Sequence, residues 1–141
     1  MDDVLLGKAA IIERCLKRIG EEYRGHENEL ATNFTRQDSI LLNLQRACEA
    51  SIDAGMHLVR LHRLGIPTES RQVFTQLAQS SVIDPQLGQH LAGMVGFHNI
   101  AVHNYRELDL DVVRSILSNR LHDLQTFAEC LVKLALPHDE K

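Results

Sequence analysis

Polar side chains that could do chemistry gather at the end of a segment that carries no charged residue. His98, Asn99, His103 and Tyr105 lie in the stretch that begins at Pro85 and contains no Asp, Glu, Lys or Arg. An imidazole titrates near neutral pH, which suits His103 to general acid–base catalysis. The simpler alternatives are that His103 interacts with the last carbonyls of its helix, that His98 is a satisfied core or interface histidine, and that Tyr105 is a packed loop aromatic.

The spacing of these residues decides which of them can act together. Asn99 and His103 are four residues apart and share one face of a continuous helix. His98 and His103 are five apart and diverge by roughly 140° on a helix with 3.6 residues per turn. They converge only if the helix ends or tightens near Val102, or if one of them meets a group from another chain.

Other residue types that often carry chemistry point to no second site. His57 and His62 are five residues apart, not the three or four that aligns two metal ligands on a helix, and no H-E-x-x-H motif occurs. Cys15, Cys48 and Cys130 are isolated and lie among apolar residues, which predicts buried thiols in a reducing compartment. We therefore expect neither a metal nor another cofactor.

The charge-free segment itself is unusual. It is too polar for a membrane span, and a surface helix would carry charges, so we expect a helix enclosed on most sides, within a bundle or in a subunit interface. Gly93 and Gly96 in its middle indicate close approach of another backbone, from the same chain or from a two-fold mate. Two stripes follow the helical period: an apolar one of Leu87, Leu91, Met94, His98 and Ala101, and a small-to-polar one of Ala92, Gly96, Asn99 and His103.

Helical periodicity runs through the whole chain and predicts the elements that position this segment. A first helix of about five turns ends near Gly25, and a second covers 36–64 after a capping box of Thr35 and Asp38. A short third helix follows Thr68 and ends near residue 81. The fourth begins at Asp84 and Pro85 and runs to about residue 102, and the fifth spans residues 109 or 111 to 135.

Composition sets the fold class and excludes several functions. With 141 residues, 4% aromatic and 44% hydrophobic, the chain is expected to form one domain over residues 1–141, an all-α antiparallel bundle of about five helices. A net charge of −4 gives no sign of broad electrostatic capture of nucleic acid, so any RNA contact is expected to be local, at a small patch or in a groove between subunits. Asp2 and Asp3 have the wrong sign for a secretory signal, and no apolar run is as long as a membrane span, so we predict a cytoplasmic protein.

The motif His98-Asn-Ile-Ala-Val-His103-Asn-Tyr105 resembles the Arg-x4-His-x-Tyr signature of HepT-like toxins, a branch of the HEPN superfamily. The resemblance implies a homodimeric, metal-independent ribonuclease with the motif residues of both subunits lining one cleft. It makes His103 the general acid or base and lets Asn99 orient that imidazole or bind a phosphate oxygen. It also implies a nucleotidyltransferase (MNT) antitoxin that transfers AMP to Tyr105, where added bulk and negative charge would repel RNA.

The chain departs from this signature at one position, because His98 stands where the family has Arg. Histidine lacks the bidentate fork of Arg and is fully charged only below its pKa, so we predict weakened or abolished cleavage. Arg60, His62 and Arg63, with Arg71 nearby, form a small basic cluster that could touch RNA phosphates, although a solvated helix end explains it as well.

Two alternatives to a ribonuclease toxin remain. The chain could be an inactive HEPN subunit that binds a nucleotidyltransferase, which the substitution at His98 keeps open. It could instead be a structural helical adaptor, in which case the charge-free helix would be only an oligomer interface.

Overall fold

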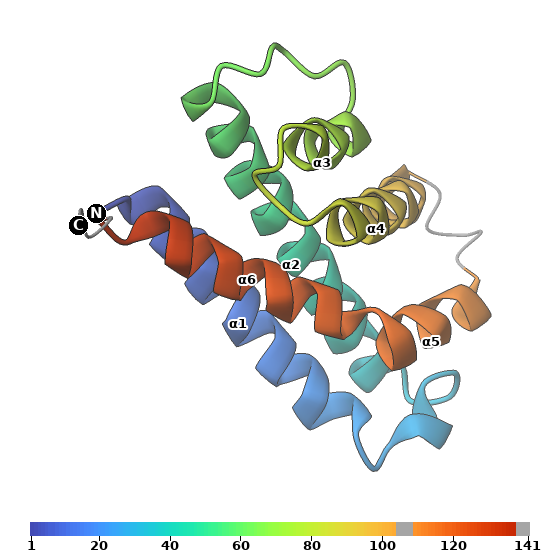
Figure 1. The fold of residues 1–141 in the computed structure, drawn as a ribbon. Helices are drawn as coiled ribbons and strands as arrows, with labels where there is room; N and C mark the ends of the chain where they lie inside the picture. Colours follow the sequence, from blue (N-terminus) through green and yellow to red (C-terminus); the bar gives the residue numbers. More distant parts are fainter. Residues whose placement is uncertain (104–108, 138–141) are drawn as a thin grey trace.

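The computed structural model describes the backbone of residues 1–103 and 109–137, and the side chains of residues 1–96 and 109–137. Within this part all regular elements are helical, which confirms the all-α prediction. The elements are α1 (Asp3–Tyr23), the 3-10 helix η1 (Glu27–Glu29), α2 (Phe34–Leu61), α3 (Ser70–Gln79), α4 (Pro85–His103), α5 (Leu110–Asn119) and α6 (Leu121–Ala135) (Figure 1).

Helix boundaries follow local signals, and one cap differs from the prediction. The Asp2 carboxylate accepts hydrogen bonds from the backbone N–H groups of Val4 and Leu5 and caps α1. The expected capping box at Thr35 is wrong, because Asn33 caps α2 by accepting from the N–H of Arg36 at 3.1 Å. The cap lies two residues earlier than predicted, so the exposed N–H groups of the first turn belong to a helix that begins at Phe34, two residues sooner.

The predicted fifth helix is two helices. α5 ends at Asn119 and α6 begins at Leu121, with Arg120 between them at φ −118° and ψ −10°. The Arg120 N–H still donates to the carbonyl of Ile116 at 2.8 Å, so the last turn of α5 closes normally before the chain changes direction. The apolar spacing continues across this break, which is why periodicity alone joined the two segments.

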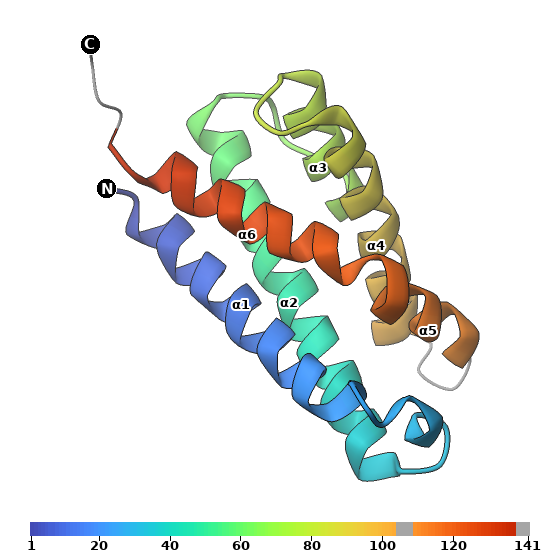
Figure 2. The ribbon, with the colours of Figure 1, turned by 60° about the horizontal axis from the view of Figure 1, so that its bottom comes forward.

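The helices form two groups that Figures 1 and 2 show from different sides. α1 packs along both α2 and α6, while α3 and α4 pack mainly against each other on the side of the bundle away from α1. α2 reaches both groups, and α6 crosses from α1 to α4. A continuous apolar core connects them, built from Leu, Ile, Val and Ala with two fully buried rings, Phe74 and Phe127.

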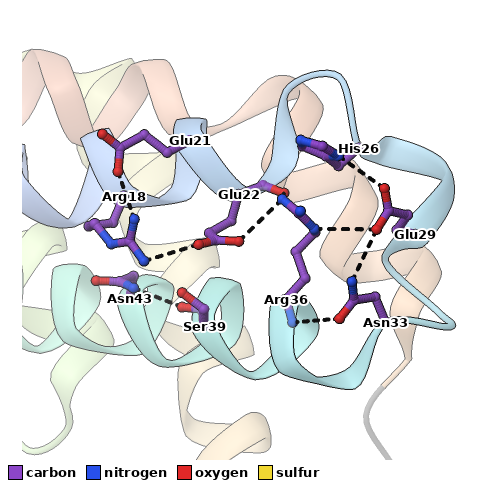
Figure 3. A network of polar contacts seen from close by, with 9 residues as sticks. All are labelled: Arg18, Glu21, Glu22, His26, Glu29, Asn33, Arg36, Ser39 and Asn43. Carbon is purple, nitrogen blue, oxygen red and sulfur yellow. Dashed lines mark hydrogen bonds and ion pairs between the residues drawn. The ribbon is translucent and has the colours of Figure 1, made fainter.

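Ion pairs and hydrogen bonds between charged side chains stabilise the turn between α1 and α2. The Arg36 guanidinium donates to the carbonyl of Glu22 at 3.0 Å and pairs with the Glu22 carboxylate at 3.2 Å (Figure 3). It also lies 3.4 Å from the carboxylate of Glu29, which accepts from Asn33 and pairs with His26. This network connects α1, η1 and the first turn of α2.

Candidate functional site

The helix that carries the predicted motif begins as its sequence indicates. The carboxylate of Asp84 accepts from the N–H groups of Gln86 and Leu87 at 3.0 and 3.2 Å, and Pro85 occupies the first helical position. Proline needs no hydrogen-bond partner there and its φ suits a helix, so this start is well defined.

Close packing against α3 fixes the position of α4. A Cβ at Gly88 would lie 2.7 Å from the Cβ of Ala78 and 3.0 Å from the carbonyl oxygen of Phe74, so only glycine lets the two helices approach this closely. The Phe74 ring in turn packs edge-to-face on Phe127 of α6, with centroids 5.6 Å apart. α4 is therefore held by backbone contact and buried rings.

The expected close approach at Gly93 and Gly96 is not found within the described part of the chain. A Cβ at Gly93 would meet nothing within 4 Å, and one at Gly96 would lie 3.7 Å from Cδ and 3.8 Å from Nε of Arg71. The close backbone contact lies about two turns earlier, at Gly88. An enclosed helix, within the bundle or in a subunit interface, was predicted. Over residues 85–96 of this single chain, Gln89 and Gly93 are exposed, so this part of α4 is not enclosed by its own bundle.

The uncovered face of α4 borders a groove of about 350 Å³ against α5. The residues that line it are Gln89, His90, Gly93, Met94, Val112, Ser115, Ile116 and Arg120. The ring Nδ1 of His90 lies 3.3 Å from the Asp123 carboxylate, and the Arg120 guanidinium lies 3.8 Å from the same group. This histidine–carboxylate pair joins α4 to α6, and sequence reasoning missed it because the partners are far apart in the chain.

A larger pocket of about 640 Å³ lies between the end of α1 and the junction of α5 and α6. Arg24, Glu27 and His122 are among its lining residues, and none of its lining residues belongs to α4. Size alone would favour this pocket, but the described residues that line it include none of the predicted site.

The structure places the backbone of the motif from His98 to His103 along the last turns of α4. His98, Asn99 and His103 lie in α4, which runs without interruption to His103, so the helix does not end at Val102. Asn99 and His103 therefore keep the four-residue spacing that puts them on one face. The side chains of these three residues, and Tyr105 as a whole, lie outside the described residues.

The cysteines are placed as a helical core would place them. Cys15 and Cys48 are buried, and burial raises the pKa of the Cys48 thiol to about 12, which keeps it protonated and unreactive. Cys130 is partly buried.

In the residues that the structure describes, no group of three or more His, Cys, Asp or Glu side chains is arranged to hold a metal ion. None of the described helices is both long and apolar enough to cross a membrane.

Comparison with known proteins gives a family and close structural relatives. The family model of HepT-like ribonucleases matches residues 12–131. The mRNA nuclease HepT of Shewanella oneidensis is 46% identical over 131 residues, which cover 93% of this chain and 98% of that protein.

Two solved structures are similar over nearly the whole chain. One is a tri-AMPylated Shewanella oneidensis HEPN toxin in complex with MNT antitoxin, 46% identical with a TM-score of 0.86, covering 95% of this chain and 99% of that chain. The other is a toxin–antitoxin with AMP-PNP, 44% identical with a TM-score of 0.85, covering 93% of this chain and 99% of that chain. Sequence, helix order and three-dimensional fold agree, and we conclude that this chain belongs to the family of HepT-like ribonucleases.

Proposed function

We propose that this chain is the toxin of a type II toxin–antitoxin pair and cleaves RNA without a metal ion. One observation carries the proposal: the HepT-like match spans residues 12–131, and within it His103 and Asn99 lie four residues apart on one unbroken helix. Relatives with the same fold include an mRNA nuclease and a HEPN toxin in complex with MNT antitoxin. We treat residues 1–141 as one domain and place its activity in the cytoplasm.

The imidazole of His103 performs the proton transfers in this proposal. As a general base it takes the proton from a ribose 2′-hydroxyl, and as a general acid it protonates the leaving oxygen. Asn99, one turn earlier, orients the imidazole or donates to a phosphate oxygen. The packing of α4 on α3 through Gly88 supports this role, because a catalytic side chain needs a helix that does not shift.

A homodimer is the second part of the proposal. The outward face of α4 has no formal charge, and Gln89 and Gly93 on it are exposed with open space around the Gly93 position. Such a face is suited to a second copy of the chain, which would bring two motifs beside one groove. His98 and His103 of one chain diverge on a single straight helix. A two-fold arrangement would bring His98 or His103 of the second copy near those of the first.

His98 determines how active this form is. At a phosphate-binding position, a neutral imidazole provides one N–H donor where Arg provides a charged fork with five. We therefore expect the chain with His98 to cleave RNA slowly and the His98→Arg chain to cleave it faster. If His98 abolishes cleavage completely, the chain would instead act as an inactive HEPN subunit that binds the nucleotidyltransferase. Only the residue at position 98 favours this second candidate function.

Tyr105 is the proposed acceptor of AMP from the MNT antitoxin. It follows His103 by two residues in the sequence, so a nucleotide on its phenol oxygen would add bulk and negative charge close to the imidazole. RNA phosphates would then be repelled from the site. Mass spectrometry after co-expression with the antitoxin tests this role: AMP adducts on the Tyr105 peptide support it, and adducts elsewhere alone contradict it.

A growth assay tests the toxin proposal. Expression of the His98→Arg chain is expected to arrest growth, and adding His103→Ala to it is expected to restore growth. His122→Ala is the matched control, since His122 is an exposed histidine on α6 outside the motif, and it should leave the arrest intact. If the His98→Arg chain is produced in folded form and growth continues, the proposal is wrong.

A further inference from the structure

One arginine stands out in the half of the bundle that carries the motif. Apart from histidines, Arg71 is the only ionisable side chain in α3 and α4 together. It is exposed in the first turn of α3, and its Cδ and Nε lie against Gly96, in the C-terminal half of α4. Its charge is therefore presented beside the same helix that carries Asn99 and His103.

The stability of α3 does not explain Arg71. A cation in the first turn of a helix opposes the helix dipole, which favours anions there. Glu69, the N-cap residue, makes no side-chain capping bond, and α3 contains no acid that could pair with Arg71 at three or four residues' spacing. Among the side chains that the structure describes, Arg71 has no ion-pair partner. An exposed guanidinium that no described acid pairs with is available to an anion.

Its place along α4 relates it to the motif. Gly96, Asn99 and His103 follow one stripe of the helical period, and α4 is continuous across them. Seven residues separate positions 96 and 103, which is about 10 Å along the axis at 1.5 Å per residue. A group beside Gly96 therefore lies on the same face of α4 as Asn99 and His103. It is too far from His103 along the helix axis for both to contact one phosphate.

We propose that Arg71 binds a backbone phosphate of the RNA, adjacent to the phosphate on which His103 acts, and holds the strand along α4. This rests on the proposed ribonuclease function and adds a residue outside the motif. The planar guanidinium suits phosphate because it donates two parallel hydrogen bonds while keeping its charge. In a chain with net charge −4, one unpaired cation beside a charge-free helix has a large local effect.

RNA binding is the direct test, measured on chains that carry His103→Ala so that the RNA stays intact. The probe is a short fluorescent single-stranded RNA titrated at several salt concentrations. Arg71→Ala is expected to weaken binding about tenfold and to reduce the slope of log K against log salt by about 0.7, the value for one phosphate contact. Arg71→Lys should recover most of the slope, because the charge is kept.

Arg14→Ala is the matched control. Arg14 is exposed on α1, and the substitution removes the same charge from the molecule. It is expected to leave affinity and salt slope close to those of the parent. Thermal unfolding of each variant checks that the comparison is between folded proteins.

The outcomes separate the two proposals. If the parent binds RNA and Arg71→Ala behaves like Arg14→Ala, the role of Arg71 is wrong and the ribonuclease proposal is untouched. If the parent binds no RNA and the His98→Arg chain neither cleaves RNA nor arrests growth, both proposals fail. A loss of affinity in Arg71→Ala with an unchanged salt slope also contradicts a phosphate contact.

Discussion

The turn between α1 and α2 and the pair α3–α4 are stabilised in different ways. The first is a network of side-chain ion pairs around Arg36, Glu22 and Glu29, all three partly buried (Figure 3). The second is held by apolar packing around Phe74 and Gly88. α4 has no Asp, Glu, Lys or Arg of its own and is held mainly by this packing, with the His90–Asp123 pair joining it to α6, so the charges beside it come from neighbouring elements, Arg71 of α3 among them.

Removing the ring that holds α3 in place should have the largest effect on stability. Phe74→Ala is expected to lower the free energy of unfolding by about 3–5 kcal/mol, because a fully buried ring is lost and a cavity remains. Urea denaturation measures this difference. Phe34→Ala is the control, since Phe34 is 67% exposed and should change stability little. Equal effects of the two substitutions would contradict the packing described for α3 and α4.

A methyl group distinguishes the buried face of α4 from its open face. Gly88→Ala should destabilise the protein by about 1–3 kcal/mol, because the new Cβ clashes with Ala78 and the backbone of Phe74. Gly93→Ala should stabilise it by about 1 kcal/mol, because alanine favours the helix and the site is open. Thermal unfolding of the two variants checks the opposite signs. A destabilising Gly93→Ala in a monomeric sample would show that this face is covered.

Acidic pH should weaken the ion-pair network at the turn between α1 and α2 and lower the free energy of unfolding by a small amount. Hydrogen bonds from His26 and Asn33, and the charges of Arg36 and His26, hold the pKa of Glu29 below its ordinary value. A lowered folded-state pKa means that this carboxylate stabilises the fold above its unfolded pKa. The contribution is then lost as the pH falls through the lowered value. Glu29→Gln should flatten the stability–pH curve in that range, and an unchanged curve would contradict the contribution of this network.

The sequence predicted the helices better than it predicted their contacts. The period of apolar residues and the Asp84–Pro85 start placed α4 correctly, since both signals are local. The break at Arg120 was missed, because the apolar spacing runs on through it. The cap at Asn33 was missed for a similar reason: Thr35 and Asp38 offered a competing cap of nearly equal quality.

Contacts between distant residues could not be predicted. The two mid-helix glycines at 93 and 96 were a reasonable indication of close backbone approach, yet the contact is at Gly88, because Phe74 and Ala78 of α3 face that turn. The same holds for the His90–Asp123 pair and for Arg71 against Gly96. The motif was recognisable because its residues lie within eight positions of the sequence, whereas these partners come together only when the bundle forms.

Cleavage of single-stranded RNA by purified protein in the presence of EDTA is the most direct test of the role of His103. The His98→Arg chain is expected to cleave at neutral pH, and the chain with His98 is expected to cleave more slowly. Adding His103→Ala to the His98→Arg chain should lower the rate at least about a hundredfold, since general acid–base catalysis is lost. Equal cleavage with and without His103, or dependence of cleavage on added metal, would contradict the mechanism.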